Sequence, residues 1–144
     1  MSFVRNSLLA IVAFAAICAA APALADMVKY KAELTGAGEV PPTTSKGAGS
    51  IEATYDSATK TLSWAGAYSD LTGPAIAAHF HGPAALGTNA PVMVPVDAAT
   101  SPFKGSATIT AEQAQALVDG KMYFNIHTSA NKPGEIRGQM TLEK

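Results

Sequence analysis

The chain has 144 residues, with ten Lys and Arg against eleven Asp and Glu, so its formal net charge is −1. A balance this close to neutral excludes the large basic surface that binds nucleic acid or an anionic membrane. Hydrophobic residues make up 48% of the chain, which is too many for an intrinsically disordered protein. Length and composition therefore predict one compact domain.

Residues 1–25 have the pattern of a secretory signal peptide. Arg5 supplies the positive start, an apolar stretch runs from residue 8 to about residue 21, and the small-x-small motif at residues 23–25 marks the cleavage site. The apolar stretch is shorter than the roughly 20 residues that a membrane-spanning helix needs. We therefore expect cleavage after residue 25, no membrane insertion of the mature chain, and a periplasmic or secreted protein whose single domain is residues 26–144.

The only cysteine, Cys18, lies within the predicted signal peptide. The mature chain is thus predicted to have neither a disulfide nor a thiolate metal site. Its nine Lys and Arg against eleven Asp and Glu give a net charge of −2. Its stability must come from packing.

From residue 27 onward, apolar and polar residues alternate with the period of two that is typical of half-buried strands. The alternation is clearest in residues 27–34, where Val28, Tyr30, Ala32 and Leu34 share one face. The expected strands are residues 27–34, 47–55, 61–68, 75–81, 92–96, 105–109, 121–128 and 135–142. These predict an all-β fold, an antiparallel, Greek-key-like sandwich or barrel of seven or eight strands. The alternative is an α+β fold with a single open sheet.

Two local signals refine this fold. Pro95 interrupts residues 92–96, which places that strand at a sheet edge. Thr110 with Gln113 three residues later forms a capping box, so one short helix is expected at about residues 111–119. We expect Leu117 and Val118 to pack this helix against the sheet.

The three histidines are the residues most suited to chemistry. In His79-Phe80-His81 the two imidazoles share one strand face, with Cα atoms roughly 6.5 to 7 Å apart. Ile76, Ala78 and Phe80 are expected on the opposite, inward face. His127 lies in another strand and supplies a third imidazole if the two strands are neighbours.

Three imidazoles suit Cu, Zn, Ni or Fe, and the lack of cysteine disfavours a structural zinc site. We favour copper, as Cu(I) or Cu(II), with zinc as second choice. The alternative is that these residues are ordinary surface or structural histidines. On the residues alone both interpretations stay open.

Several neighbours of the histidines have two interpretations each. Asn125 shares a face with His127. It either accepts the imidazole N–H and so orients His127 for metal binding, or takes part in an ordinary cross-strand hydrogen bond. Glu135 and Arg137 form either a network that supports the metal ligands or, the interpretation we favour, a salt bridge. The segment at residues 39–42 either covers the histidines or, as we favour, crosses the end of the sheet as a rigid loop. Met93 is a possible soft ligand, whereas Met122 is predicted to lie in the core.

Four blocks of the sequence resemble, in order, the motifs of the CHRD domain, a family first described in the developmental protein chordin and common in exported bacterial proteins. They are Gly38-Glu39-Val40-Pro41-Pro42, His79-Phe80-His81-Gly82-Pro83-Ala84, Tyr123-Phe124-Asn125-Ile126-His127-Thr128 and Pro133-Gly134-Glu135-Ile136-Arg137-Gly138-Gln139. The resemblance covers nearly all of the predicted mature chain. The resemblance implies an all-β domain and suggests metal binding. The histidine blocks are the family motifs that can be matched residue by residue to this chain.

Three functions from different classes follow. The first, which we favour, is an exported metal-binding protein that stores, buffers or delivers copper through His79, His81 and His127. The second is a non-catalytic interaction module of the cell envelope or exterior, with structural histidines.

The third is a redox enzyme resembling superoxide dismutase, which we disfavour because three histidines cannot fill two metal sites. The sequence also lacks a Gly-x-Ser-x-Gly motif, so no enzyme activity is expected. A homodimer that shares the metal site is left open.

Overall fold

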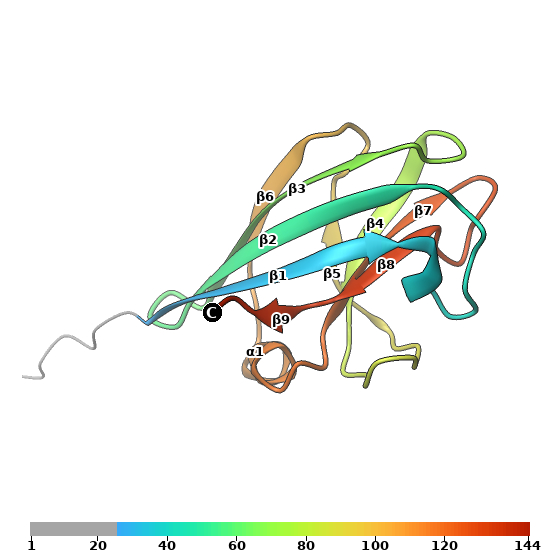
Figure 1. The fold of residues 1–144 in the computed structure, drawn as a ribbon. Coiled ribbons are helices and arrows are strands. Elements are labelled where there is room, and N and C mark those ends of the chain that lie inside the picture. Colours follow the sequence, from blue (N-terminus) through green and yellow to red (C-terminus); the bar gives the residue numbers. More distant parts are fainter. Residues whose placement is uncertain (1–25) are drawn as a thin grey trace, which may run out of the picture.

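The structure, a computed structural model, describes residues 26–144, so the predicted signal peptide lies outside the described residues. Figure 1 shows the arrangement of the strands and helices. In chain order the elements are β1 (Met27–Thr35), the 3-10 helix η1 (Gly36–Gly38), β2 (Ala48–Asp56), β3 (Thr61–Ser69), β4 (Ala75–His81), β5 (Val92–Val96), β6 (Phe103–Thr108), α1 (Ala111–Val118), β7 (Tyr123–Thr128), β8 (Ile136–Gln139) and β9 (Thr141–Leu142). Each predicted strand is present, and the last one is divided into β8 and β9.

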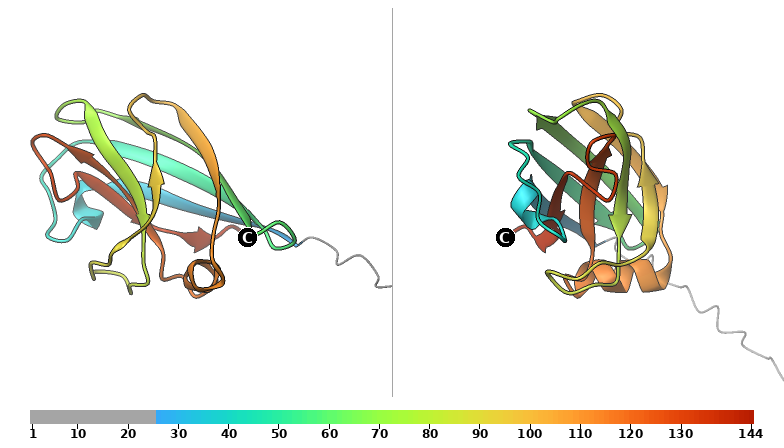
Figure 2. Two further views of the ribbon diagram at one scale, coloured as in Figure 1. Left: turned by 180° about the vertical axis from the view of Figure 1, so that it is seen from behind. Right: turned by 90° about the vertical axis from the view of Figure 1, so that its right-hand side faces the viewer.

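The strands form one antiparallel sheet in the order β5-β4-β7-β8-β1-β2-β3-β6, with β9 paired to β1. The sheet curls until its edge strands, β5 and β6, face each other, so that it is nearly closed (Figure 2). Helix α1 lies across one end of this barrel. The fold is therefore all-β, as predicted, and not the open single sheet of the alternative. The predicted edge position of residues 92–96 is confirmed.

Aromatic side chains from opposite parts of the sheet meet in the interior. Phe80 packs against Trp64 and Phe124 with ring centroids 5.3 and 5.0 Å apart, and Phe124 also stacks on Phe103 at 5.7 Å. Such pairs add to the free energy gained by burying apolar surface. Because these rings come from β3, β4, β6 and β7, they hold the two sides of the barrel together.

Two predicted core positions are wrong. The side chain of Ile76 is 56% exposed, because the pairing of β4 with β7 shifts register between Ala75 and Ala77 and turns the intervening residue outward. Val118 is 61% exposed, whereas Ala114 and Leu117 are buried. Successive helix residues are rotated by about 100°, so the residue after Leu117 points away from the sheet.

The helix signals act as the sequence predicts. The Thr110 hydroxyl accepts a hydrogen bond from the backbone N–H of Gln113, whose side chain accepts one from the N–H of Thr110. Helix α1 ends at Val118, one residue before the predicted end.

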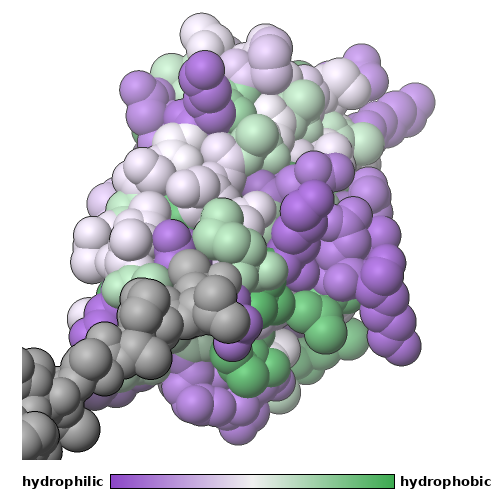
Figure 3. Space-filling model, turned by 90° about the vertical axis from the view of Figure 1, so that its left-hand side faces the viewer, coloured by the Kyte–Doolittle hydropathy of each residue, from purple (hydrophilic) through white to green (hydrophobic). Residues whose placement is uncertain are grey.

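Seen from the side shown in Figure 3, the surface is a mixture of hydrophilic and hydrophobic residues. Among residues 26–144, no helix combines the length and the apolar character needed to cross a bilayer.

Candidate metal centre

The three histidines come together on the outer face of the sheet. Ala78 and Phe80 point into the core, so the alternating His79 and His81 of β4 point outward. Strand β7 pairs antiparallel with β4 and brings His127, whose register partner is Ala77, onto the same face. One nitrogen of each ring lies within 4.8 Å of the corresponding nitrogens of the other two. The predicted convergence of the three imidazoles is therefore present.

Backbone carbonyls fix the orientation of two of the rings. His81 Nδ1 lies 2.9 Å from the carbonyl oxygen of Ala90, and His127 Nδ1 lies 2.8 Å from that of Lys132. Because a carbonyl oxygen only accepts, both Nδ1 atoms carry the proton and both Nε2 atoms carry a lone pair. Carbonyl partners of this kind orient metal-binding histidines in many proteins.

His79 completes the group through a hydrogen bond to its neighbour. Its Nδ1 lies 3.1 Å from Nε2 of His127, which holds a lone pair, so His79 is the donor. A metal ion would replace the shared proton and take both nitrogens as ligands. Nitrogens bound to one ion at about 2.0–2.1 Å are at most about 4.2 Å apart, so even the widest pair needs to approach by only about 0.6 Å.

The electrostatics of the site favour neutral imidazoles. Burial lowers the pKa of His79, and the neighbouring rings of His127 and His81 lower it further. Burial also lowers the pKa of His81, against the opposing effect of its hydrogen bond to Ala90. Neutral imidazole is the form that binds metal ions. A lowered pKa thus favours the neutral form of His79 and His81 near neutral pH.

Tyr123 and Arg137 support the ring of His81. Tyr123 stacks parallel to His81, with ring centroids 4.8 Å apart and planes inclined by 1°. The Arg137 guanidinium lies 3.4 Å from the centre of the Tyr123 ring, and it donates hydrogen bonds to Asn89 Oδ1 and to the carbonyl of Thr88. The stack leaves His81 little freedom to rotate. Sequence reasoning placed Arg137 near the site but gave no sign of this stack.

The family model of the CHRD domain matches residues 30–140. The chain belongs to the CHRD domain family. This match includes all three histidines together with the four motif blocks that carried the resemblance. No curated protein and no solved structure matches the chain significantly.

Glu39 is a buried acidic residue near the histidines of this CHRD domain. The sequence did not lead us to include it among the candidate site residues. Its side chain is 4% exposed, and its Oε1 has no hydrogen-bond partner within the described residues. Burial raises the pKa of Glu39 to about 7, although nearby Arg137 and a hydrogen bond from Asn125 act in the opposite direction. The motif Gly38-Glu39-Val40-Pro41-Pro42 was the available signal, but we favoured a rigid connecting loop over one that covers the site.

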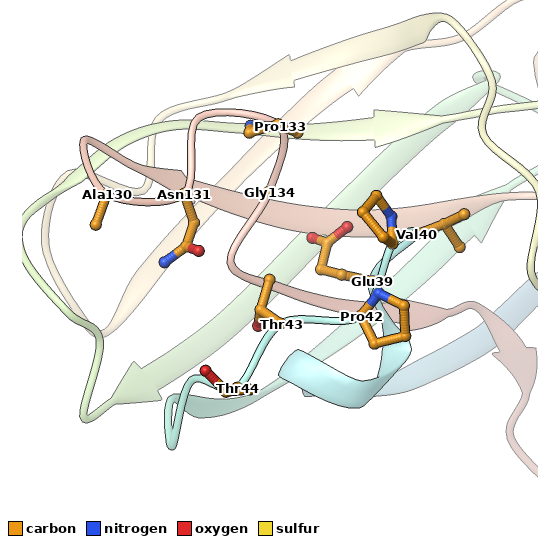
Figure 4. Close-up of a pocket in the computed structure, with 10 residues that line it drawn as sticks. Glu39, Val40, Pro42, Thr43, Thr44, Ala130, Asn131, Pro133 and Gly134 are labelled. Carbon is orange, nitrogen blue, oxygen red and sulfur yellow. The ribbon is translucent and has the colours of Figure 1, made fainter.

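A cleft of about 360 Å³ opens beside Glu39. One wall is formed by residues 39–44 and the other by Ala130, Asn131, Pro133 and Gly134. Figure 4 shows the Glu39 side chain between these two loops. The second loop also contains Lys132, whose carbonyl oxygen lies 2.8 Å from His127 Nδ1, so the same loop lines the cleft and contacts the histidine group.

The predicted salt bridge between Glu135 and Arg137 is wrong. The Glu135 carboxylate instead accepts hydrogen bonds from the hydroxyls of Ser45 and Thr72 at 2.6 Å, and from that of Thr128. The guanidinium of Arg137 is already engaged by a ring and two oxygens. Glu135 therefore ties loops together and does not contact the histidines directly.

The methionines of the neighbouring strands lie in or against the core. Met122 is fully buried there, as predicted, and Met93 packs against the same cluster. Neither side chain is therefore placed on the outer face where the histidines meet.

We expect Glu39→Gln to raise the free energy of unfolding by about 2 kcal/mol above pH 7 and to change it little below pH 4.5. Because the pKa of Glu39 is raised in the folded state, its folding contribution is most favourable at low pH and is lost as pH rises from 4.5 through 7. Gln keeps the size but has no proton to lose. Urea unfolding across this range measures the effect.

The control for this prediction is Glu52→Gln, which removes a carboxylate from an exposed position on β2. Its effect on stability should show no such rise with pH. If the two variants follow the same pH profile, burial of Glu39 is not the cause.

Proposed function

We propose that this CHRD domain is an exported metal-binding protein that holds copper through His79, His81 and His127, for storage, buffering or delivery. The observation that carries the proposal is the grouping of three imidazole nitrogens within 4.8 Å. Two of the rings are fixed by carbonyls so that Nε2 carries the lone pair, and His81 Nε2 is buried without a partner in the described residues. A buried acceptor without a partner carries a free-energy cost that a bound ion removes.

Copper is favoured over zinc by the ligand chemistry. Imidazole suits both ions, but copper(II) binds nitrogen ligands more tightly in the usual order of divalent metal affinities. The only cysteine precedes residue 26, so the predicted mature chain offers no thiolate for a structural zinc site. Export through the predicted signal peptide would deliver the protein to a compartment where it meets copper from outside the cell.

Copper titration of the purified protein tests the proposal. We expect one ion per chain, and we expect each single substitution of His79, His81 or His127 by Ala to lower the affinity by at least about 100-fold. Circular dichroism checks that each variant is folded. The chain has only these three histidines, so no other imidazole can compensate.

The matched control is Lys132→Ala. It changes the side chain beside the site but keeps the backbone carbonyl that holds His127. This variant should bind copper as the wild type does. If the triple histidine variant keeps the wild-type copper affinity, the proposed function is wrong.

A further inference from the structure

A second buried acceptor without a partner lies beside the three histidines. Asn125 is 2% exposed on β7, two residues before His127 and directly across from its register partner His79 on β4. Within the described residues its Oδ1 has no hydrogen-bond partner, and the same is true of His81 Nε2. Buried polar atoms are rarely left without a hydrogen-bond partner, so these two unpaired atoms need an explanation.

The amide of Asn125 is oriented by the acidic residue on its other side. A Cβ atom built on Gly134 would overlap both the Glu39 carboxylate and Asn125 Nδ2, so these two groups lie against the same point of the backbone. Hydrogen bonding from Asn125 also lowers the pKa of Glu39. Because Nδ2 donates toward this carboxylate, Oδ1 is left for the other neighbour of the amide, the His81 ring.

Two lone pairs therefore face the same buried space. Asn125 Oδ1 can only accept, and His81 Nε2 can only accept because Nδ1 donates its proton to Ala90. The Asn125 side chain also lies within hydrogen-bonding reach of the His81 ring. Two buried acceptors side by side are unfavourable unless a donor or a cation lies between them, and a metal ion can accept both lone pairs at once.

We infer that the carboxamide oxygen of Asn125 is the fourth ligand of the metal centre and makes the centre prefer Cu(II) over Cu(I). This inference rests on the proposed copper-binding function. Three imidazoles and one oxygen form a ligand set that suits Cu(II), whereas Cu(I) is favoured by soft sulfur ligands. The methionines that would supply such sulfur, Met93 and Met122, pack with the core.

The test compares both oxidation states in wild type and in Asn125→Leu, which keeps the size but removes the oxygen. Competition titrations with Cu(II) in air and with Cu(I) without oxygen give the two affinities. We expect the substitution to weaken Cu(II) binding at least about tenfold and to change Cu(I) binding by less than about threefold. Gln115→Leu is the matched control, since it removes an exposed carboxamide of helix α1 that donates to Asp119, and it should change neither affinity.

The outcomes separate this inference from the proposed function. Equal losses for both ions would mean that Asn125 supports the fold, and unchanged Cu(II) affinity would mean that its oxygen is not a ligand; either result overturns the inference. If the wild type binds neither ion, the proposed function itself fails.

If Asn125→Leu does not fold, Glu39→Leu replaces it, because that change removes the carboxylate toward which Nδ2 points. A selective loss of Cu(II) affinity supports the inference, and any other pattern overturns it.

Discussion

We expect Glu135→Ala to lower the free energy of unfolding by about 4 kcal/mol at neutral pH. The carboxylate is fully buried and accepts hydrogen bonds from Ser45, from both the backbone N–H and the hydroxyl of Thr72, and from Thr128. These donors belong to three separate segments of the chain. Alanine would leave several of them buried without an acceptor. Denaturant unfolding at constant temperature measures the loss.

The pH dependence of the wild type provides an independent check of this role. Burial by itself raises the pKa of Glu135, but the hydrogen bonds from Ser45, Thr128 and Thr72 outweigh it and lower the pKa to about 2. A lowered pKa contributes stability that is complete above pH 4.5 and is lost as pH falls toward 2. Between pH 4.5 and 2 the free energy of unfolding of the wild type should therefore fall by about 3 kcal/mol because of Glu135. The alanine variant should not show this fall.

Glu135→Gln serves as the matched variant, because it keeps the shape and one acceptor oxygen. Like protonation, it removes the charge, so it should lower the free energy of unfolding by about 3 kcal/mol at neutral pH. A loss as large as that of the alanine variant would show that the charge matters more than the number of hydrogen bonds. No loss in either variant would contradict the proposed role of Glu135.

The strands were predictable because a half-buried sheet imposes a period of two on its sequence. In β1 the buried residues Tyr30, Ala32 and Leu34 alternate with exposed ones along the whole strand. The error in the strands occurred where a neighbouring strand alters the pattern. The register shift that exposes Ile76 depends on how β4 pairs with β7, and no residue within β4 reports it.

The histidine group was predictable only in part. Alternation within β4 places His79 and His81 on one face whatever the fold, so that step follows from local sequence. The arrival of His127 depends on β7 lying next to β4, although about 40 residues of chain separate the two strands. Sequence reasoning stated this adjacency as a condition, and the structure supplies it.

The environment of the histidines was not predictable, because loops create it. An outward-facing residue on a sheet is ordinarily exposed, yet every residue of β7 is buried. The carbonyls of Ala90 and Lys132 belong to such loops, as does the buried Glu39. Loop conformation depends on contacts with distant segments, so periodicity carries no information about it. These loops turn exposed histidines into an enclosed site.

Gly134→Ala should lower the free energy of unfolding by about 3 kcal/mol, because glycine meets two requirements at this position. Its φ of +140° lies in a region that residues with a Cβ rarely adopt, and the added atom would overlap the Glu39 carboxylate and the amide of Asn125. The same overlap would displace the Asn125 amide from the position in which we propose that it binds the metal. Denaturant unfolding gives the stability, and a Cu(II) titration shows whether the site is disturbed.

Gly87→Ala separates the effect of backbone strain from that of steric overlap. Gly87 has a φ of +80°, but no atom lies within 4 Å of the point that an added Cβ would occupy. Backbone strain alone should cost this control about 1 kcal/mol. Adding Glu39→Ala to Gly134→Ala should recover the part of the loss that comes from overlap, which a double-mutant cycle measures directly. If Gly134→Ala is no more destabilising than the control, the close packing of Glu39 and Asn125 against this glycine is not required for stability.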